Sequence, residues 1–513
     1  MRLQLSKSVK SSYQTSVRRL KVLEECKRDQ DLNGLLGQNK TLVLKRIKSG
    51  KKSQTASIKS LKVGNKVYAE ERVADGFYDS ISKLKSLDAV TSKSLDSFSS
   101  DYKHIIKISK AAKKIPRISP AKATELLKRI RVSVADFYSI TAGHYLNGGV
   151  VALNHFCFLF NTILESIELA DTSELNTALA VILPKGHGKD KNLDSSWRII
   201  SSCPFLAKCF DIYLGELFKD DWISCQAATQ FQGEGMSHEL AALLLTCTIR
   251  NSLQEGKPLF VLLLDAKSAF DRVLRQILVR RLFLDTTQDQ RILYWDLRLA
   301  SRKTFCSWDG NLMGPIHDQR GVEQGGPNSS DNYKIYNNEQ LREAQESGLG
   351  SSVGNFHVAA VGQADDSALC SNSLHQLQYL LNLTNNYCSK YQVELSTPKT
   401  KLLVFATKDT EYIKYCKLVS PIHLGETNID FVSVAEHVGI MRSNSGNLPH
   451  IHQRITSHNR ALGSILYAGM SRHHRANPLS SLQAEKTFCS PVRFSGVGAL
   501  ILSKSEKKPD FVL

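Results

Sequence analysis

The sequence predicts an α+β fold in which a small antiparallel sheet carries the functional residues. The apolar run Phe260–Leu264 is bounded like a buried strand and ends at Asp265. About a hundred residues later, the apolar halves of Val358–Cys370 flank Asp365 and Asp366. Two apolar segments around an Asp-Asp turn predict a β-hairpin, because aspartate tolerates the left-handed backbone of tight turns.

Three carboxylates would crowd one place if the hairpin lay beside the first strand. Like charges this close are unfavourable unless divalent cations lie between them. Hard oxygen ligands with positions left open for phosphate suit Mg²⁺, and a metal pair is the usual device for nucleotidyl transfer. An aspartate after a strand is more often a helix cap, and an Asp-Asp pair is more often a solvated turn. The motifs therefore indicate a metal site only when they are taken together.

The segment between these motifs contains Gln324–Pro327, a Gln-Gly-Gly-Pro sequence that leads into a predicted helix over 331–345. Two glycines before a proline and a helix start suit a backbone that approaches a ligand closely. Gln324 offers both a hydrogen-bond donor and an acceptor. In this order the three motifs resemble the catalytic core of reverse transcriptases, in particular those of non-LTR (LINE-type) retrotransposons. The resemblance covers about residues 120–500.

The resemblance implies a right-hand polymerase whose subdomains follow the chain. A basic N-terminal extension would occupy 1–118, the fingers 119–256, a palm with an antiparallel sheet 257–435, and a primer-grip strand with a partial helical thumb 436–513. The implied reaction is the addition of deoxynucleotides to the 3′-hydroxyl of a DNA primer, with RNA as the template.

The resemblance also implies a metal site. Asp265, Asp365, Asp366 and the backbone carbonyl of Ala266 would hold two Mg²⁺ ions, with Mn²⁺ as a possible substitute. One ion would lower the pKa of the 3′-hydroxyl, and the other would bind the triphosphate and the leaving oxygen.

The implied nucleotide site includes Lys185 and Arg198, on a predicted hairpin of two strands at 179–183 and 197–201. Fixed cations beside a leaving pyrophosphate stabilise developing charge; the alternative for this loop is a solvent-exposed basic turn. Lys399 would approach the leaving phosphates and could act as a general acid. Gln324 would help to position the nucleotide. Phe270, in a predicted helix over 268–283, would exclude the ribose 2′-hydroxyl, pack in the core, or do both.

Further elements are predicted from local patterns. They are a loop at 86–102, a helix that starts at Ser119-Pro120, hairpins at 308–311 and around 365–366, a helix over 374–391, a strand to Phe405, a short strand at 437–440 and a helix over 449–470. Gln363 stands where most relatives carry an aromatic residue, and Gly326 where an acidic residue is common.

The chain of 513 residues has a formal net charge of +18, which indicates a polyanionic partner. Residues 1–120 hold 27 lysines and arginines against 11 acidic residues. The densest cluster, 45–52, predicts either an RNA-contacting extension or a solvated helical face. Eleven cysteines without a CxxC pair or a signal peptide predict free thiols in the nucleus and cytoplasm. No apolar stretch predicts a membrane span.

Two alternatives to a retrotransposon polymerase stay open. One is an enzyme of the group II intron type, in which a maturase role dominates. The other is an inactive, nucleic-acid-binding relic of a retroelement. No endonuclease pattern is visible, so a partner nuclease is expected elsewhere in a longer polyprotein.

Overall fold

A computed structural model describes residues 58–465, apart from 113, 132–134, 166–174, 186–188, 301, 310, 420–421 and 445, together with residue 492. The basic cluster at 45–52 lies outside the described residues. The chain divides into two compact units. One contains Ala56–Gly439 and Ser443–Ser445; the described part of the other includes helix α17 (Leu448–Ile465). No described helix is long and apolar enough to cross a membrane.

The sheet that carries the aspartates has four antiparallel strands in the order β10-β11-β5-β12. Their bounds are β5 (Leu259–Leu264), β10 (Ala360–Gln363), β11 (Asp366–Ser371) and β12 (Lys401–Phe405). Leu262 of β5 is opposite Leu369 on one side and Leu402 on the other. The predicted strand before Asp265 and the neighbouring hairpin are both confirmed.

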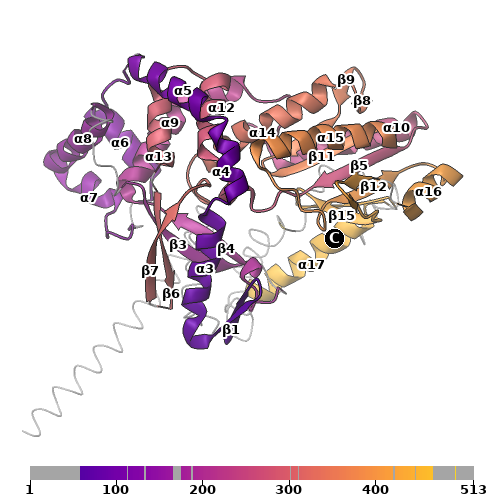
Figure 1. Ribbon diagram of the computed structural model, residues 1–513, viewed down its shortest axis with the longest axis horizontal. Coiled ribbons are helices and arrows are strands. Elements are labelled where there is room, and N and C mark those ends of the chain that lie inside the picture. The colour runs from indigo at the N-terminus through magenta and orange to yellow at the C-terminus, as the bar shows by residue number, and fades with distance from the viewer. Residues whose placement is uncertain are drawn as a thin grey trace, which may run out of the picture. The chain divides into compact units, whose positions relative to one another are not determined.

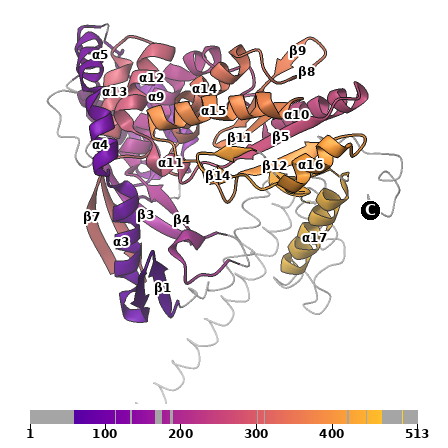
Figure 2. The ribbon, with the colours of Figure 1, turned by 45° about the vertical axis from the view of Figure 1, so that its right-hand side comes forward.

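Alternate residues of β5 enter two different cores, because successive side chains of a strand point to opposite faces. Phe260, Leu262 and Leu264 share a core with α14 (Ser329–Glu346) and α15 (Leu374–Tyr391). Leu259, Val261 and Leu263 share another core with α10 (His238–Gln254). Figures 1 and 2 show α15 running along β11 and β5. Helices therefore cover both faces, and all six residues of β5 are buried.

A second four-stranded sheet has the order β4-β3-β6-β7. It comprises β3 (Thr177–Pro184), β4 (Trp197–Ser202), β6 (Arg302–Trp308) and β7 (Asn311–Asp318), and β3 pairs with β6 in parallel. Helix α3 (Val73–Lys85) packs against it, and the ring of Phe77 lies 5.5 Å from that of Trp197 and 4.6 Å from that of Trp308. Figure 1 shows α3 beside these strands. The two hairpins predicted in this region are confirmed.

The third core lies among helices. They are α5 (Ser99–Ala111), α6 (Pro120–Arg129), α8 (Gly149–Glu165), α9 (Phe205–Ser224), α12 (Arg275–Asp285) and α13 (Arg291–Leu299). The remaining elements are β1 (Ser60–Val63), β2 (Lys66–Ala69), α4 (Ala89–Asp96), α7 (Ala142–Asn147), α11 (Ala269–Arg272), β8 (Ser351–Val353), β9 (Phe356–Val358), α16 (Glu411–Val419), β13 (His423–Leu424), β14 (Thr427–Asn428), β15 (Val434–His437), β16 (Ile440–Ser443) and short 3-10 turns at Glu70–Arg72 and Asp194–Ser196.

Two helix predictions are confirmed by their bounds. Helix α15 spans 374–391 as predicted. Helix α6 begins at Pro120, and the side chain of Ser119 caps it by accepting a hydrogen bond of 3.2 Å from the amide of Lys122. Proline in the first turn and serine at the N-cap are the signals that predicted this start. The helix predicted over 449–470 is described to 465 as α17.

The loop predicted at 86–102 is wrong, because the structure has α4 and the first turn of α5 there. Asp88 caps α4, and its carboxylate accepts a hydrogen bond of 2.7 Å from the amide of Thr91. Leu95 and Phe98 pack against the helical core. The Asp88 cap and the packing of Leu95 and Phe98 thus stabilise helix in a segment whose serine-rich composition is typical of a loop.

The single helix predicted over 268–283 is also wrong. It is divided into α11 and α12 by Val273, whose φ of −55° and ψ of 123° are extended. The carbonyl of Val273 accepts a hydrogen bond of 2.7 Å from the amide of Gly321, which a continuous helix would not allow.

The short strand predicted at 437–440 is a turn. Strand β15 ends at His437, and Val438 and Gly439 take φ values of 47° and 77°. The boundary expected at 118 does not separate compact units, because Ala56–Gly439 form one unit.

Candidate active site

The chain brings its three motif aspartates to one end of β5. Asp265 directly follows β5, and Asp366 begins β11. Leu264 is opposite Ser367 in the antiparallel ladder, so Asp265 and Asp366 occupy the next positions on adjacent strands. The predicted crowding of carboxylates is therefore present in the register of the sheet.

The turn of the hairpin differs by one residue from the prediction. Gln363 pairs with Asp366, so the two turn residues are Ala364 and Asp365. Ala364 takes the left-handed conformation, with φ of 56°. Asp366 therefore belongs to the strand, and only Asp365 of the pair lies in the turn.

The tip of this hairpin is held by side chains from residues 230–232. Gln363 Nε2 donates a hydrogen bond of 2.8 Å to Gln232 Oε1. The amide of Ala364 donates one of 3.2 Å to Gln230 Oε1. The side chain of Gln363 therefore fixes the hairpin tip by hydrogen bonding.

The carboxylates of the site repel one another when ionised. Burial raises the pKa of Asp366 to about 6, with help from the charges of Asp365, Asp265 and Glu436. Burial, followed by the charge of Asp265, also raises the pKa of Asp365. A divalent cation among these oxygens would relieve the repulsion, so the donor set fits a hard metal ion.

Lys399 contacts the first of these carboxylates directly. Its Nζ lies 3.2 Å from Oδ1 and 3.0 Å from Oδ2 of Asp265. Ser396 donates its amide to the carbonyl of Asp265 at 2.7 Å and accepts the amide of Lys399 at 3.0 Å. A short turn thus places the ammonium on Asp265, which agrees with the predicted proximity of Lys399 to the site.

Lys185 and Arg198 come from the hairpin of β3 and β4. Arg198 is opposite Leu183 and is exposed. Lys185 Nζ donates a hydrogen bond of 3.0 Å to the carbonyl of Ser195. Burial, followed by the charges of Lys189, Lys399 and Arg198, lowers the pKa of Lys185. The pKa of Lys185 thus responds to the charges of Lys399 and Arg198, so this hairpin and the Lys399–Asp265 pair are linked electrostatically.

The Gln324–Pro327 segment lies against β4. The amide of Ser201 donates a hydrogen bond of 3.0 Å to the carbonyl of Gln324. Gly325 has φ of 100°, and an added Cβ would lie 3.1 Å from Cγ2 of Ile200. The glycine is therefore needed for its backbone conformation and for close contact with β4. The side chain of Gln324 is half-buried.

Phe270 and Ala266 lie beside the aspartates in sequence and are both half-buried. The ring of Phe270 packs 5.2 Å from that of Tyr333. Ala266 forms an isolated antiparallel bridge with Leu395. The predicted packing of Phe270 in the core is therefore confirmed, and its role in sugar exclusion stays a prediction.

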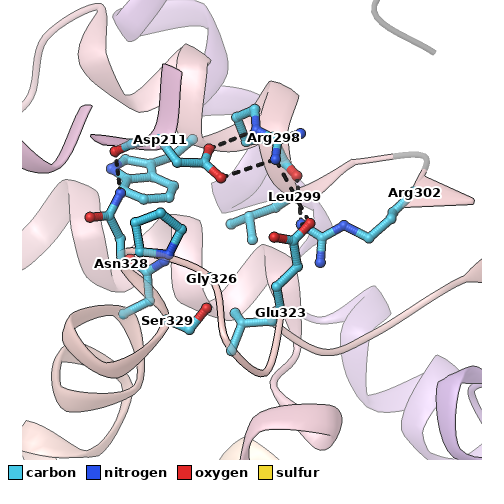
Figure 3. Close-up of a pocket in the computed structure, with 12 residues that line it drawn as sticks. Asp211, Arg298, Leu299, Arg302, Glu323, Gly326, Asn328 and Ser329 are labelled. Carbon is cyan, nitrogen blue, oxygen red and sulfur yellow. Dashed lines mark hydrogen bonds and ion pairs between the residues drawn. The ribbon is translucent and has the colours of Figure 1, made fainter. Parts of the chain in front are cut away.

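A buried ionic network behind the Gln324–Pro327 segment was missed by sequence reasoning (Figure 3). Arg298 Nε and Nη2 lie 2.7 and 3.0 Å from the carboxylate oxygens of Asp211. Arg302 Nη2 lies 3.3 Å from Glu323 Oε1, and Asn328 donates a hydrogen bond to the carbonyl of Asp211. Glu323 and Asn328 flank Gln324–Pro327, so the network anchors both ends of that segment.

This network also contains a group of metal-binding residue types, Cys203, Asp211 and Glu323, whose ligand atoms lie within 4.8 Å of one another. The carboxylates already have arginine partners. Although burial acts to raise it, Arg302 and Arg298 hold the pKa of Glu323 below its usual value. Burial raises the pKa of the Cys203 thiol. The arginines therefore supply the charge that a cation would supply, and the arrangement is a buried ion-pair network.

One sequence signal could have revealed the network. Arg298 lies on the apolar face of α13, one turn from Tyr294 and next to Leu299, and both neighbours are buried. A charged residue on such a face needs a buried partner.

Comparison with known protein families identifies an enzyme class for the part of the chain that contains these residues. Residues 184–434 match the family model described as reverse transcriptase (RNA-dependent DNA polymerase). No curated protein matches the chain. The matched range contains every residue predicted for the site, and reverse transcriptase domains generally use divalent metal ions. Residues 184–434 are therefore a reverse transcriptase domain, and the chain that carries it is an RNA-directed DNA polymerase, a nucleotidyltransferase.

Proposed function

We propose that this chain is the polymerase of a non-LTR retrotransposon, which extends a DNA primer on an RNA template with deoxynucleoside triphosphates. The observation that carries the proposal is the convergence of Asp265, Asp365 and Asp366 at the end of β5, beside Lys399. Carboxylates that repel one another, with the ammonium of Lys399 3.0 Å from one of them, suit metal ions and a polyphosphate together.

The donor atoms fit two magnesium ions. The carboxylates of Asp265, Asp365 and Asp366, with the carbonyl of Ala266, would hold Mg²⁺, or Mn²⁺ as a substitute. When bound, the ions would supply the Lewis acidity that lowers the pKa of the primer 3′-hydroxyl and offsets charge on the triphosphate.

The cationic side chains have distinct tasks in this proposal. Lys185 and Arg198 bind the phosphates, and fixed positive charge stabilises the pyrophosphate as it leaves. Lys399 neutralises Asp265 before the nucleotide arrives, since its ammonium lies on that carboxylate at 3.0 Å. Because Lys399 is 69% exposed, it can turn toward the leaving phosphates and donate a proton there.

The remaining residues position the sugar and the base. The half-buried ring of Phe270 faces the 2′ position and excludes a hydroxyl by overlap and by leaving it unpaired. Gln324 lies on a segment that is anchored at both ends by the buried network, so its position is fixed before the nucleotide binds.

The order and spacing of the motifs support the non-LTR type, and the match to a reverse transcriptase model does not favour the inactive relic. A group II intron-type enzyme differs by its maturase role. Stimulation of intron splicing by the purified chain would favour that type. The location in the nucleus and cytoplasm stays a prediction.

Primer extension by the purified full chain tests the proposal. A DNA primer annealed to RNA is expected to lengthen with deoxynucleotides when Mg²⁺ or Mn²⁺ is present, and not with a chelator. Asp366→Asn should abolish extension and leave template binding nearly unchanged, because affinity depends mainly on phosphate contacts. No extension by the wild type with either metal, or undiminished extension by Asp366→Asn, would contradict the proposal.

A further inference from the structure

We propose that Lys85 is a positioning residue of the nucleotide site, which holds Asp271 and through it Phe270 in place. The inference rests on the proposed function, because it concerns the residue that faces the sugar. Lys85 lies on α3, far before residues 184–434 that match the reverse transcriptase model. A segment outside the matched domain would then set the substrate selectivity of the domain.

The first observation is a buried ion pair. The side chain of Lys85 is 2% exposed, and its Nζ lies 3.1 Å from Oδ1 of Asp271. A second carboxylate oxygen, Oδ2 of Asp318, lies 3.9 Å away and belongs to a side chain that is 1% exposed. A buried ammonium is costly without partners, so the amine of Lys85 must stay beside Asp271 and Asp318, and losing one member of the pair would leave an uncompensated buried charge.

The second observation is that the end of α3 is attached to the strand that leads to the Gln324 segment. The carbonyl of Lys85 accepts a hydrogen bond of 3.0 Å from the amide of Gln319. Arg320 Nε donates one of 2.9 Å to the carbonyl of Leu84. The amide of Leu87 donates one of 2.7 Å to Gln319 Oε1. The last carbonyls of α3 thus accept hydrogen bonds from Gln319 and Arg320. These bonds hold the C-terminal end of the helix, and with it the backbone of Lys85, in place.

The third observation is that α11 depends on its neighbours for its position. It is a four-residue turn, and isolated helices of that length are not stable. Its backbone is held by Val322, whose amide donates a hydrogen bond of 2.8 Å to the carbonyl of Phe270. A Cβ on Gly321 would lie 2.8 Å from the carbonyl oxygen of Asp271, so the two segments touch closely. The Lys85–Asp271 pair adds a buried side-chain contact to this attachment, beside the Phe270–Tyr333 ring contact and the ion pair of Arg272 with Glu394.

Asp271 connects the pair with the residues that contact the nucleotide. It directly follows Phe270, and its charge acts to raise the pKa of Lys185. Phe270 has its other support in Tyr333. Loss of the amine would leave an unpaired carboxylate that turns toward Arg320 or Lys185, and α11 would shift with it. A displacement of about 1 Å at a substrate-positioning residue can cost about 10²-fold in rate.

The experiment compares Lys85→Met with Lys83→Met. Lys83 lies on the same helix and is exposed, so Lys83→Met is a matched control for the charge and for the substitution. With the full chain, Lys85→Met should raise the KM for deoxynucleotides about tenfold and lower the ratio of deoxy- to ribonucleotide incorporation about tenfold. Lys85→Arg keeps the positive charge and should recover part of both.

Hydrogen–deuterium exchange over 266–274 measures the attachment without catalysis and covers the case in which Lys85→Met is poorly active. Faster exchange there in Lys85→Met and in Asp271→Asn, with an unchanged rate in Lys83→Met, would support the inference. Unchanged exchange over 266–274, or a sugar selectivity equal to that of Lys83→Met, would overturn it. If the wild type does not extend primers at all, the proposed function fails, and the exchange result alone decides whether Lys85 holds α11.

Discussion

Replacing Asp265 with asparagine separates the chemistry of the site from its stability. Lys399 and Asp265 are 69% and 32% exposed, and ion pairs at such a surface contribute about 0–1 kcal/mol. The substitution also removes a negative charge that contributes to the raised pKa values of Asp365 and Asp366. The lost attraction and the relieved repulsion oppose each other, so the free energy of unfolding should change by less than about 1 kcal/mol.

The rate of primer extension, in contrast to the stability, should fall sharply. A ligand that serves both metal ions supports several kcal/mol of transition-state stabilisation, and about 4 kcal/mol corresponds to about 10³-fold in rate. The assay is single-nucleotide extension with saturating Mg²⁺, together with thermal unfolding. We expect extension to fall by at least about 10³-fold and Tm to move by no more than about 2–4 °C.

Asp430→Asn is the matched control. Asp430 is 69% exposed and lies 2.7 Å from Lys401, so it loses a comparable surface ion pair away from the other carboxylates. It should leave both extension and Tm nearly unchanged. Extension by Asp265→Asn at a near wild-type rate, or a Tm far below that of Asp430→Asn, would refute the assignment of Asp265.

Three further predictions follow from the fold and the site. Phe270→Ala should raise ribonucleotide incorporation with deoxynucleotide use less affected; a lowered Tm with unchanged sugar selectivity would show that the ring serves packing alone. Deleting 1–57, which holds 14 lysines and arginines against 4 acidic residues, should weaken RNA binding and reduce its log–log salt slope by about 0.7–0.9 for each lost phosphate contact, whereas an unchanged slope would leave this segment without an RNA role. Arg298→Met should lower the free energy of unfolding in urea by about 3–5 kcal/mol, because Asp211 stays buried without its partner; a loss no larger than that of Arg280→Met, at the exposed pair with Asp101, would contradict this.

The deletion ends at residue 57 because helix α3 must stay in the chain: it contributes to a hydrophobic core and to the ion pair with Asp271. Removing 1–118, the whole predicted extension, would take away Phe77 and Ile81 from the core of the second sheet and Lys85 from Asp271. The prediction for this region rested on its charge, although Val73, Phe77 and Ile81 recur at the four-residue spacing of a buried helix face. Their partners, such as Trp197 and Cys306, lie more than a hundred residues away.

Elements with strong local signals were predictable from sequence. Helix α15 has apolar residues at helical spacing throughout, and β5 is an uninterrupted apolar run. The division between α11 and α12 was not predictable, because it depends on a hydrogen bond from Gly321, 48 residues beyond Val273 in the sequence. Local propensity favours one continuous helix, whereas the hydrogen bond from the amide of Gly321 to the carbonyl of Val273 requires a break at Val273.

The aspartates of the site were predictable for a different reason. Asp265 follows β5 and Asp366 begins β11, and the apolar pattern of both strands is visible, so their pairing suffices to bring these two aspartates together, with Asp365 in the adjoining turn. The ion pairs of Lys85 and Arg298, in contrast, join side chains from elements that are far apart in the sequence. Sequence shows such residues only as charges in apolar surroundings and does not identify their partners.

The central position of β5 has a consequence for synthesis of the chain. Both of its edges pair with strands made much later, β11 at Asp366–Ser371 and β12 at Lys401–Phe405. At about 5–20 residues per second, translation needs several seconds or more to proceed from Leu264 to Phe405. Throughout that time an apolar strand has two unpaired edges, which is the kind of segment that associates with other chains. The strand that delivers Asp265 is therefore also the one most in need of protection while the polypeptide is being made.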